Sequence, residues 1–238
     1  MKNVGLIASK EFRSHLTSPT AYIVTFVFLL LTGTFFSTYL TGTGYTDTSI
    51  RGFLDPGNLL LLLFAAILTM RLLAEEKKLG TWELLLTAPV RDTEIVLGKY
   101  LGSLGVLLVM LALTLYYPLL LIWFGDPDIG PIVTSYLGLI LLGSSALAIG
   151  LFASSVTSNQ IVAAVVAGGI LFALWFVGLA IGLVPETVGD LLAYVSLMGH
   201  FADFTRGIID TRAIIYYLSI TAMFLFLTVR SIETGRWS

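Results

Sequence analysis

The chain has 238 residues, of which 57% are hydrophobic and only 12% are charged, and its mean hydropathy is +0.94. A typical soluble domain is about 25% charged, so this composition excludes a water-soluble globular protein. The formal net charge of −2 is unremarkable, and no nucleic-acid partner is expected. The chain has no cysteine, which excludes a disulfide and a thiolate metal site.

Taken in chain order, the first 17 residues are expected to form an amphipathic helix at the membrane interface. On a helical wheel, the apolar arc is Val4, Ala8, Phe12 and Leu16, and the basic arc is Lys2, Lys10 and Arg13. Ser18-Pro19 then breaks the helix before the first apolar run. A basic leader that only sets the topology is the alternative.

Six apolar runs are long enough to cross a bilayer, which takes roughly 20 helical residues. They are continuously apolar rather than alternating, which favours helices over a β-barrel. The spans are expected at Ala21–Leu40, Gly57–Ala74, Tyr100–Phe124, Ile132–Ser155, Ile161–Val184 and Ala213–Val229. Because these spans leave no room for a soluble domain, we predict an all-α, polytopic membrane protein with a single transmembrane domain, residues 1–238.

The basic residues predict how these spans are oriented. Placing the N-terminus in the cytoplasm leaves only Arg51, Arg206 and Arg212 outside, so ten of the thirteen basic residues are inside. The positive-inside rule favours this orientation. The basic residues expected inside are Lys2, Lys10, Arg13, Arg71, Lys77, Lys78, Arg91, Lys99, Arg230 and Arg236. Both termini and the segment 75–99 would then face the cytoplasm.

The charged segment 75–99, EEKKLGTWELLLTAPVRDTEIVLGK, separates the second and third spans. Within it, Thr81–Thr87 is bounded by Gly80 in front and by Ala88-Pro89 behind, which predicts a short, separate helix. Asp92 is the expected N-cap of the helix that follows. A short helix across the mouth of a membrane bundle suits the transmission of force from a cytoplasmic partner. An ordinary solvated loop is the alternative.

The segment 185–212, before the last span, is too long for a hairpin and is half apolar. We expect one or two short helices there that dip into the outer leaflet without crossing it. The segment contains His200, which we interpret as a structural residue. The only other histidine, His15, would lie on the opposite side of the membrane, so no histidine metal site is expected within one chain.

Residue types and motifs that the sequence lacks also exclude some classes of membrane protein. No span carries an ionisable residue near its middle, because Arg71 is close enough to the cytoplasmic end to snorkel. This argues against an ion-coupled carrier and against an intramembrane protease. The chain also lacks a GxxxxGK[ST] phosphate-binding motif, so the energy for a pump would come from another polypeptide.

Hydroxyl-bearing residues are the candidates for a polar pathway through the spans. These pathway candidates are Thr25, Thr34, Ser37, Thr38 and Thr69. Their hydroxyl groups could instead satisfy carbonyls of their own helices. The sequence therefore leaves open whether they line a pathway.

The segment EEKKLGTWELLLTAPVRDTEIVLGKYLG resembles the cytoplasmic loop between the second and third spans of ABC-2-type permeases. These are the membrane subunits of one class of ATP-binding-cassette (ABC) transporters. Three further stretches, 10–23, 151–164 and 199–237, are similar to the gliding-motility (GldF-like) and nitrous-oxide-cluster branch of that family. The similarity covers essentially the whole chain, in order.

The resemblance implies an elbow helix at 1–17, a coupling helix at Thr81–Thr87 and outer re-entrant helices around Tyr194–Ile209. It also implies that the coupling helix docks on a cytoplasmic ABC ATPase. The residues expected to serve this coupling are Glu75, Glu76, Gly80, Thr81, Glu83, Leu84, Leu85, Pro89 and Arg91. The ATPase would bind ATP and Mg, so we expect no cofactor and no catalytic residue in this chain.

The resemblance further implies two permease chains, the second a copy or a paralogue, each with one ATPase. The expected location is the inner membrane of a prokaryote, and the expected activity is that of an exporter. Alternatively, the chain would be a mechanotransmitting subunit that acts on an extracytoplasmic accessory protein. The sequence does not identify a substrate.

Overall fold

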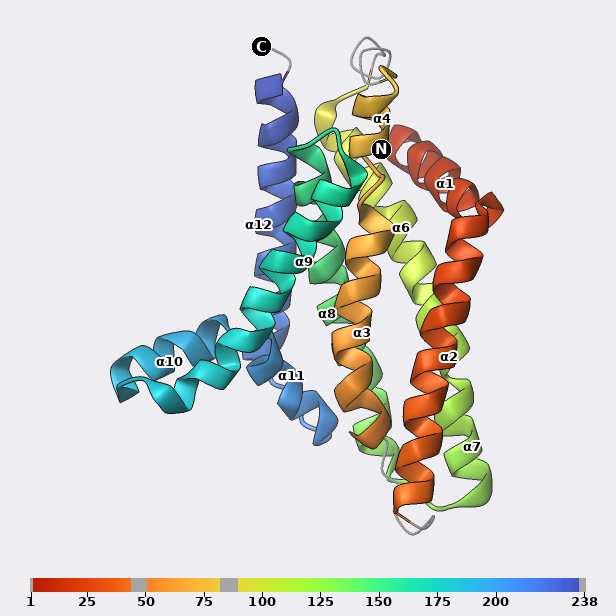
Figure 1. Ribbon diagram of the computed structural model, residues 1–238, viewed down its shortest axis with the longest axis vertical. Coiled ribbons are helices and arrows are strands. Elements are labelled where there is room, and N and C mark those ends of the chain that lie inside the picture. The colour runs from red at the N-terminus through yellow and green to blue at the C-terminus, as the bar shows by residue number, and fades with distance from the viewer. Residues whose placement is uncertain (1, 44–50, 82–89, 236–238) are drawn as a thin grey trace.

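The computed structural model describes residues 2–43, 51–81 and 90–235, and every regular element in these ranges is a helix (Figure 1). Six of its helical segments are long and apolar enough to cross a membrane. They are Pro19–Gly42, Pro56–Lys78, Asp92–Phe124, Ile129–Ser155, Gln160–Gly182 and Thr211–Thr234. Each contains or overlaps one span predicted from the sequence, so the all-α, six-span fold is confirmed.

The N-terminal residues form helix α1 (Lys2–Thr17), which packs against α6 (Asp92–Thr114). The extended backbone of Ser18 separates α1 from α2 (Pro19–Gly42), the first span. Pro19 begins α2, a position where its missing N–H has no helical partner to lose. The chain therefore turns sharply between α1 and α2, and Figure 1 shows α1 lying obliquely across the end of the bundle.

The second span consists of two helices, α3 (Arg51–Thr69) and α4 (Ala74–Lys78), joined by a turn. The third span is also divided, into α6 and α7 (Tyr116–Phe124). Pro118 explains the second break, because proline has no backbone N–H to donate and its ring clashes with the carbonyl four residues earlier. The interruption is at Leu115, three residues before Pro118.

Helix α8 (Ile129–Ser155) is the central helix, and 83% of its apolar window is buried, compared with 22% for α2. It packs against α3, α6, α9, α11 and α12. Small residues make this close packing possible, since a Cβ atom on Gly143 would lie 2.7 Å from Leu107. The small residues Ala146, Gly150 and Ser154, spaced four apart, are buried, as expected for a packing surface.

After α9 (Gln160–Phe176), the chain continues through the 3₁₀ helix η1 (Val177–Leu183) and the helices α10 (Glu186–Val195) and α11 (Leu197–Thr205). Figure 1 shows η1 and α10 projecting sideways from the bundle, part-way along its length. Helix α11 packs back on α8, where Phe201 and Phe204 contact Gly138. Two short helices therefore occupy the segment 185–212, as predicted.

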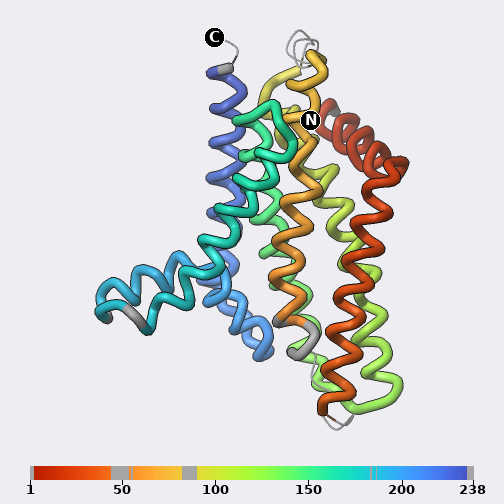
Figure 2. Tube along the Cα trace, viewed as in Figure 1, coloured from red at the N-terminus to blue at the C-terminus, as the bar shows by residue number. Residues whose placement is uncertain are grey.

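The last span is α12 (Thr211–Gly235), which packs along α8. Figure 2 shows that α1, α4 and the C-terminal end of α12 lie together at one end of the bundle, which we call the α1 end. The C-terminal end of α2 and the connection from α7 to α8 lie at the opposite end. The α1 end thus gathers most of the basic residues that predicted the orientation.

Candidate functional site

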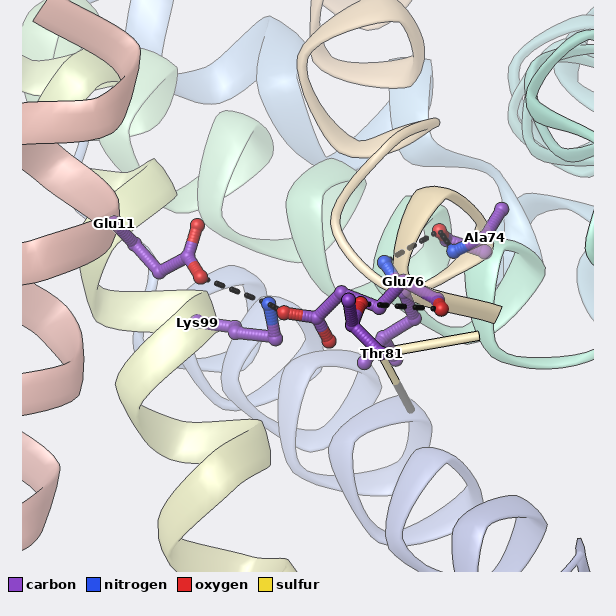
Figure 3. A network of polar contacts seen from close by, with 7 residues as sticks. Glu11, Ala74, Glu76, Thr81 and Lys99 are labelled. Atoms are coloured by element: carbon purple, nitrogen blue, oxygen red, sulfur yellow. Dashed lines mark hydrogen bonds and ion pairs between the residues drawn. The ribbon is translucent and has the colours of Figure 1, made fainter. Parts of the chain in front are cut away.

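Lys99 is the centre of an ion-pair cluster where α1, α4 and α6 meet (Figure 3). Its side chain is 3% exposed, and its Nζ lies 2.8 Å from Glu11 Oε1 of α1 and 2.8 Å from Glu76 Oε1 of α4. A buried ammonium group is costly unless carboxylates and hydrogen bonds compensate it. Lys99 therefore joins α6 to both α1 and α4, and we call these three residues the Lys99 cluster.

Glycines of α6 bring α1 close enough for this cluster to form. A Cβ atom on Gly98 would lie 2.6 Å from Ile7, and one on Gly102 would lie 2.6 Å from Glu11. Gly98 and Gly102 have the small-xxx-small spacing that allows helix backbones to approach. Helix α1 therefore rests directly on the backbone of α6, with Glu11 beside Lys99.

The beginning of α6 is tied to the beginning of α1 by a second polar contact. Asn3 Nδ2 donates a hydrogen bond of 3.1 Å to Glu94 Oε2, which also accepts a bond of 3.3 Å from the backbone N–H of Arg91. The N-cap of α6 is Arg91, one residue before the predicted Asp92. Glu94, three residues after the cap, compensates for an N-cap side chain that cannot accept a hydrogen bond.

His15, near the end of α1, is buried and contacts Arg71 at the end of the second span. Arg71 Nη2 lies 3.2 Å from His15 Nδ1, and Arg71 Nη1 donates to Ser18 Oγ at 3.0 Å. A guanidinium can only donate, so Nδ1 is the acceptor and the neutral imidazole carries its hydrogen on Nε2. Burial, followed by the charge of Arg71, lowers the pKa of His15 from 6.5 to about 4.

Ser154 of α8 fills the break between α3 and α4. Its Oγ accepts hydrogen bonds from the backbone N–H groups of Leu73 at 3.1 Å and of Ala74 at 3.0 Å, and it donates to the carbonyl of Met70 at 3.1 Å. This uses the donor and both acceptor positions of one hydroxyl group. The central helix thus supports the turn between α3 and α4.

Helix α4 has one further anchor on the bundle. Lys77 Nζ donates to the carbonyl of Ser155 at the end of α8, and Ser231 Oγ of α12 reaches the same carbonyl at 3.4 Å. Together with Glu76 of the Lys99 cluster, Lys77 attaches both sides of this short helix. Helix α4 is therefore connected to α6 and α8 directly and to α1 through Lys99.

These contacts involve residues on both sides, in the sequence, of the segment in which the coupling helix is predicted. Glu83, Leu84, Leu85 and Pro89 lie in 82–89, outside the described residues, as does most of the predicted helix Thr81–Thr87. The described residues on either side belong to α4 and its exit, and to the start of α6. The structure thus shows how the two flanks of 82–89 are held.

The described coupling residues occupy three different positions. Glu76 belongs to the Lys99 cluster, and its carbonyl accepts a hydrogen bond of 3.3 Å from Thr81 Oγ1 (Figure 3). Gly80 has a φ of +71°, a left-handed conformation that suits glycine where a helix ends. Arg91 is exposed at the cap of α6, and Glu75 is half-buried on α4. Of this group, therefore, only Glu76 takes part in the cluster.

The five pathway candidates do not lie on one surface of the chain. Thr34, Ser37 and Thr38 are exposed on α2, and Thr25 is half-buried there. Thr69 is fully buried, packs against Gly150 of α8, and donates to carbonyls of its own helix at 2.8 and 3.2 Å. Thr34 and Thr38 also donate to carbonyls of their own helix. A surface covered by a second chain could therefore include the candidates on α2, whereas Thr69 lies inside this chain.

His200 has the environment of a structural residue. Its ring stacks on that of Tyr216 with centroids 4.0 Å apart, and its Nδ1 lies 2.9 Å from the carbonyl of Ser196. In the part of the chain that the structure describes, no three His, Asp or Glu side chains gather in a way that could hold a metal ion. The local contacts of His200 thus account for its position in α11.

Sequence reasoning missed Lys99, Glu11 and Ser154 as connecting residues. Lys99 was grouped with the solvated charges of the segment 75–99, although it is buried. The spacing of Gly98 and Gly102 could have revealed it, because a helix packed on these glycines covers the side chain between them. Ser154 could not be found from the sequence, since hydrogen bonds to a distant turn leave no local pattern.

Comparison with known families agrees with this architecture. The model of the family described as "ABC-2 family transporter protein" matches residues 6–237, which is nearly the whole chain. A comparison with curated proteins gave no match. The family match includes most of α1, the six spans and the segment between α4 and α6. The chain therefore belongs to the ABC-2 family of transporter proteins and is a multi-pass membrane protein.

Proposed function

We propose that this chain is the permease subunit of an ABC exporter, in which a separate ATPase acts on the segment 82–89. The observation that carries the proposal is the Lys99 cluster, because it connects both flanks of that segment to α1. A displacement of 82–89 by the ATPase would move α4 and the start of α6. These would pull on α1, which continues into the first span.

The proposal places the α1 end in the cytoplasm, as the distribution of basic residues favours. It also assigns ATP and Mg binding to the ATPase, so this chain has no catalytic role. Two permease chains, identical or paralogous, would pair through α2 and α9, whose apolar windows are each only 22% buried. We assign the chain to the GldF-like branch and to a prokaryotic inner membrane on the similarity of residues 10–23, 151–164 and 199–237.

The contacts of the pathway candidates favour a second candidate function, that of a mechanotransmitting subunit. Thr34, Thr38 and Thr69 donate their hydroxyl hydrogens to carbonyls of their own helices, so they offer little polar surface to a substrate. A subunit that transmits force to an extracytoplasmic partner needs no such surface. The projecting η1 and α10 would then be the site of contact with that partner.

The proposed docking is tested by replacing Leu84 and Leu85 with aspartate. Two large apolar side chains in this charged segment are the expected anchors on the ATPase. Burial of one leucine contributes roughly 1.5–3 kcal/mol, so the double variant is expected to bind about two orders of magnitude more weakly or worse. The measurement is the affinity of the permease in nanodiscs for the ATPase encoded by a neighbouring gene. The mass of the complex is measured as well, and it should correspond to two permease chains and two ATPase chains.

The control for this experiment is Leu79→Asp, which introduces a single aspartate at an exposed leucine just before the segment. The control should bind the ATPase normally. If Leu84→Asp/Leu85→Asp binds as tightly as the control, or if the variant permease itself unfolds, the docking role is wrong.

A further inference from the structure

The α1 end contains a polar cavity of about 310 Å³ between α1, α4 and α6. Six charged residues line it: Lys10, Glu11, Arg71, Glu75, Glu76 and Lys99. Three of these are cations and three are carboxylates, and the nearby imidazole of His15 is neutral. The cavity as a whole is therefore electrically neutral although it is strongly polar.

Charges of both signs in this cavity lack a full complement of partners. Arg71 bonds only to the neutral groups of His15 and Ser18 and has no carboxylate partner among the described residues. On the acidic side, Lys99 is shared by two carboxylates. Glu76 Oε2 is buried and accepts no hydrogen bond within the described ranges. Buried carboxylate oxygens rarely stay without a donor, so the cavity suits a ligand that presents both an anion and a cationic donor.

A small apolar hollow of about 10 Å³, which we call the crevice, adjoins the cavity and shares His15 and Arg71 with it. Its other walls include Ala21 and Val24 of α2 and Ile67 of α3, all of which lie within membrane spans. A polar cavity at the end of the spans that continues as an apolar crevice along them matches the two parts of a phospholipid. An acyl chain in the bilayer would lie along α2 and α3 and pass over this hollow.

We propose that this cavity binds a phosphate–ammonium zwitterion, supplied by the headgroup of a phosphatidylethanolamine-type lipid whose acyl chain follows the crevice. Arg71 and Lys10 bind the phosphate, and the Nε2–H of His15 is a neutral donor at the same wall. Glu75 and Glu76 Oε2 accept hydrogen bonds from the ammonium. A bound lipid would hold α1 on the bundle. The site does not depend on the ATPase, so it can be tested separately from the proposed function.

Native mass spectrometry of the full chain in detergent measures this binding directly. The probes are palmitoyl-oleoyl phosphatidylethanolamine and the matching phosphatidylglycerol, which keeps the phosphate and lacks the ammonium. One charge-assisted hydrogen bond supplies about a tenfold preference, so the wild type should bind the ethanolamine lipid about tenfold more tightly. Glu75→Gln together with Glu76→Gln should abolish this preference, and Arg71→Met should weaken the binding of both lipids.

Matched controls use an exposed pair at the same end of the bundle. Arg230 and Glu233 of α12 lie outside the cavity and form an ion pair with an N–O distance of 2.7 Å. Arg230→Met removes one cation, as Arg71→Met does, and Glu233→Gln removes one exposed carboxylate. Both controls should keep the affinity and the preference of the wild type. Arg71→Lys, which retains the charge, should bind both lipids more tightly than Arg71→Met. This comparison separates the loss of the charge from a general loss of the fold.

Soluble phosphoethanolamine, added as a competitor, distinguishes the two sources of the zwitterion. Competition only at concentrations far above those of the lipid supports a lipid site with a contribution from the crevice. Equal binding of the two lipids to the wild type would overturn the proposal. It would also be overturned if the control variants lost as much binding as Arg71→Met.

Discussion

At the scale of single residues, Lys99 shows why all the charged partners of a buried ion pair must be neutralised together in a variant. A buried charge left without its partner destabilises a protein by about 3–5 kcal/mol, whereas replacing a whole buried ion pair by neutral groups can be nearly without cost. Lys99→Met alone would leave Glu11 and Glu76 facing each other at the positions they hold now. The combination Lys99→Met, Glu11→Gln and Glu76→Gln removes the cluster without that repulsion.

His15 gives the chain a defined response to acid. Its pKa is about 4 in the folded state and 6.5 otherwise, because burial and then the charge of Arg71 disfavour the imidazolium. Between these values the unfolded chain binds more protons than the folded chain, so stability falls as the pH falls from about 6.5 to about 4. The shift corresponds to a loss of about 3 kcal/mol from this residue.

Thermal unfolding across this pH range checks the role of His15. The wild type is expected to lose more thermal stability between neutral pH and about pH 4 than His15→Gln, which keeps an acceptor for Arg71 and has no titration. The carboxylates of the chain contribute equally to the acid-induced loss of stability in both proteins. The difference between the two proteins therefore reports on His15. Parallel stability curves for the two proteins would contradict the assignment.

At the scale of elements, the docking of α1 depends on the glycines of α6. A side chain on Gly102 would meet Glu11 Cβ at 2.6 Å and the backbone of Ala8 at 3.1 Å, so it can be accommodated only by moving α1. Overpacking of this kind typically costs about 1–3 kcal/mol. Gly102→Val is therefore expected to displace α1 while the spans stay assembled.

Labelling of an introduced cysteine measures this displacement, since the natural chain has no cysteine. Ile7→Cys places a thiol on the face of α1 that contacts Gly98, and its maleimide labelling should become several-fold faster when Gly102→Val is added. Gly169→Val is the control, because nothing lies within 4 Å of its Cβ position. Equal labelling rates in all three proteins would show that α1 does not rest on these glycines.

Elements built on local or periodic patterns could be predicted from the sequence. The six apolar runs, the break at Ser18-Pro19 and the two helices of 185–212 depend on composition and on proline chemistry, which neighbouring residues reveal. The Lys99 cluster could not be predicted, because Glu11, Glu76 and Lys99 are brought together only by the packing of α1 on α6. The interruption between α3 and α4 depends similarly on Ser154, about 80 residues away in the chain.

At the scale of the whole molecule, the chain combines one rigid centre with exposed sides. Helix α8 is almost entirely enclosed, whereas α2, α9 and α12 have most of their apolar surface uncovered within one chain. Such apolar surfaces are covered by lipid or by a second permease chain. The polar anchors of α4 and α6 lie at the α1 end, so a force applied there would act on the bundle as a unit.

The most direct test of the account measures ATPase stimulation by the permease in nanodiscs. The neutral combination Lys99→Met/Glu11→Gln/Glu76→Gln is compared with the wild type and with the exposed neutral pair Arg230→Met/Glu233→Gln. We predict that the combination binds the ATPase normally and loses most of its stimulation, while the exposed pair retains both. Full stimulation by the neutral combination would contradict the claim that the Lys99 cluster transmits the movement of the ATPase.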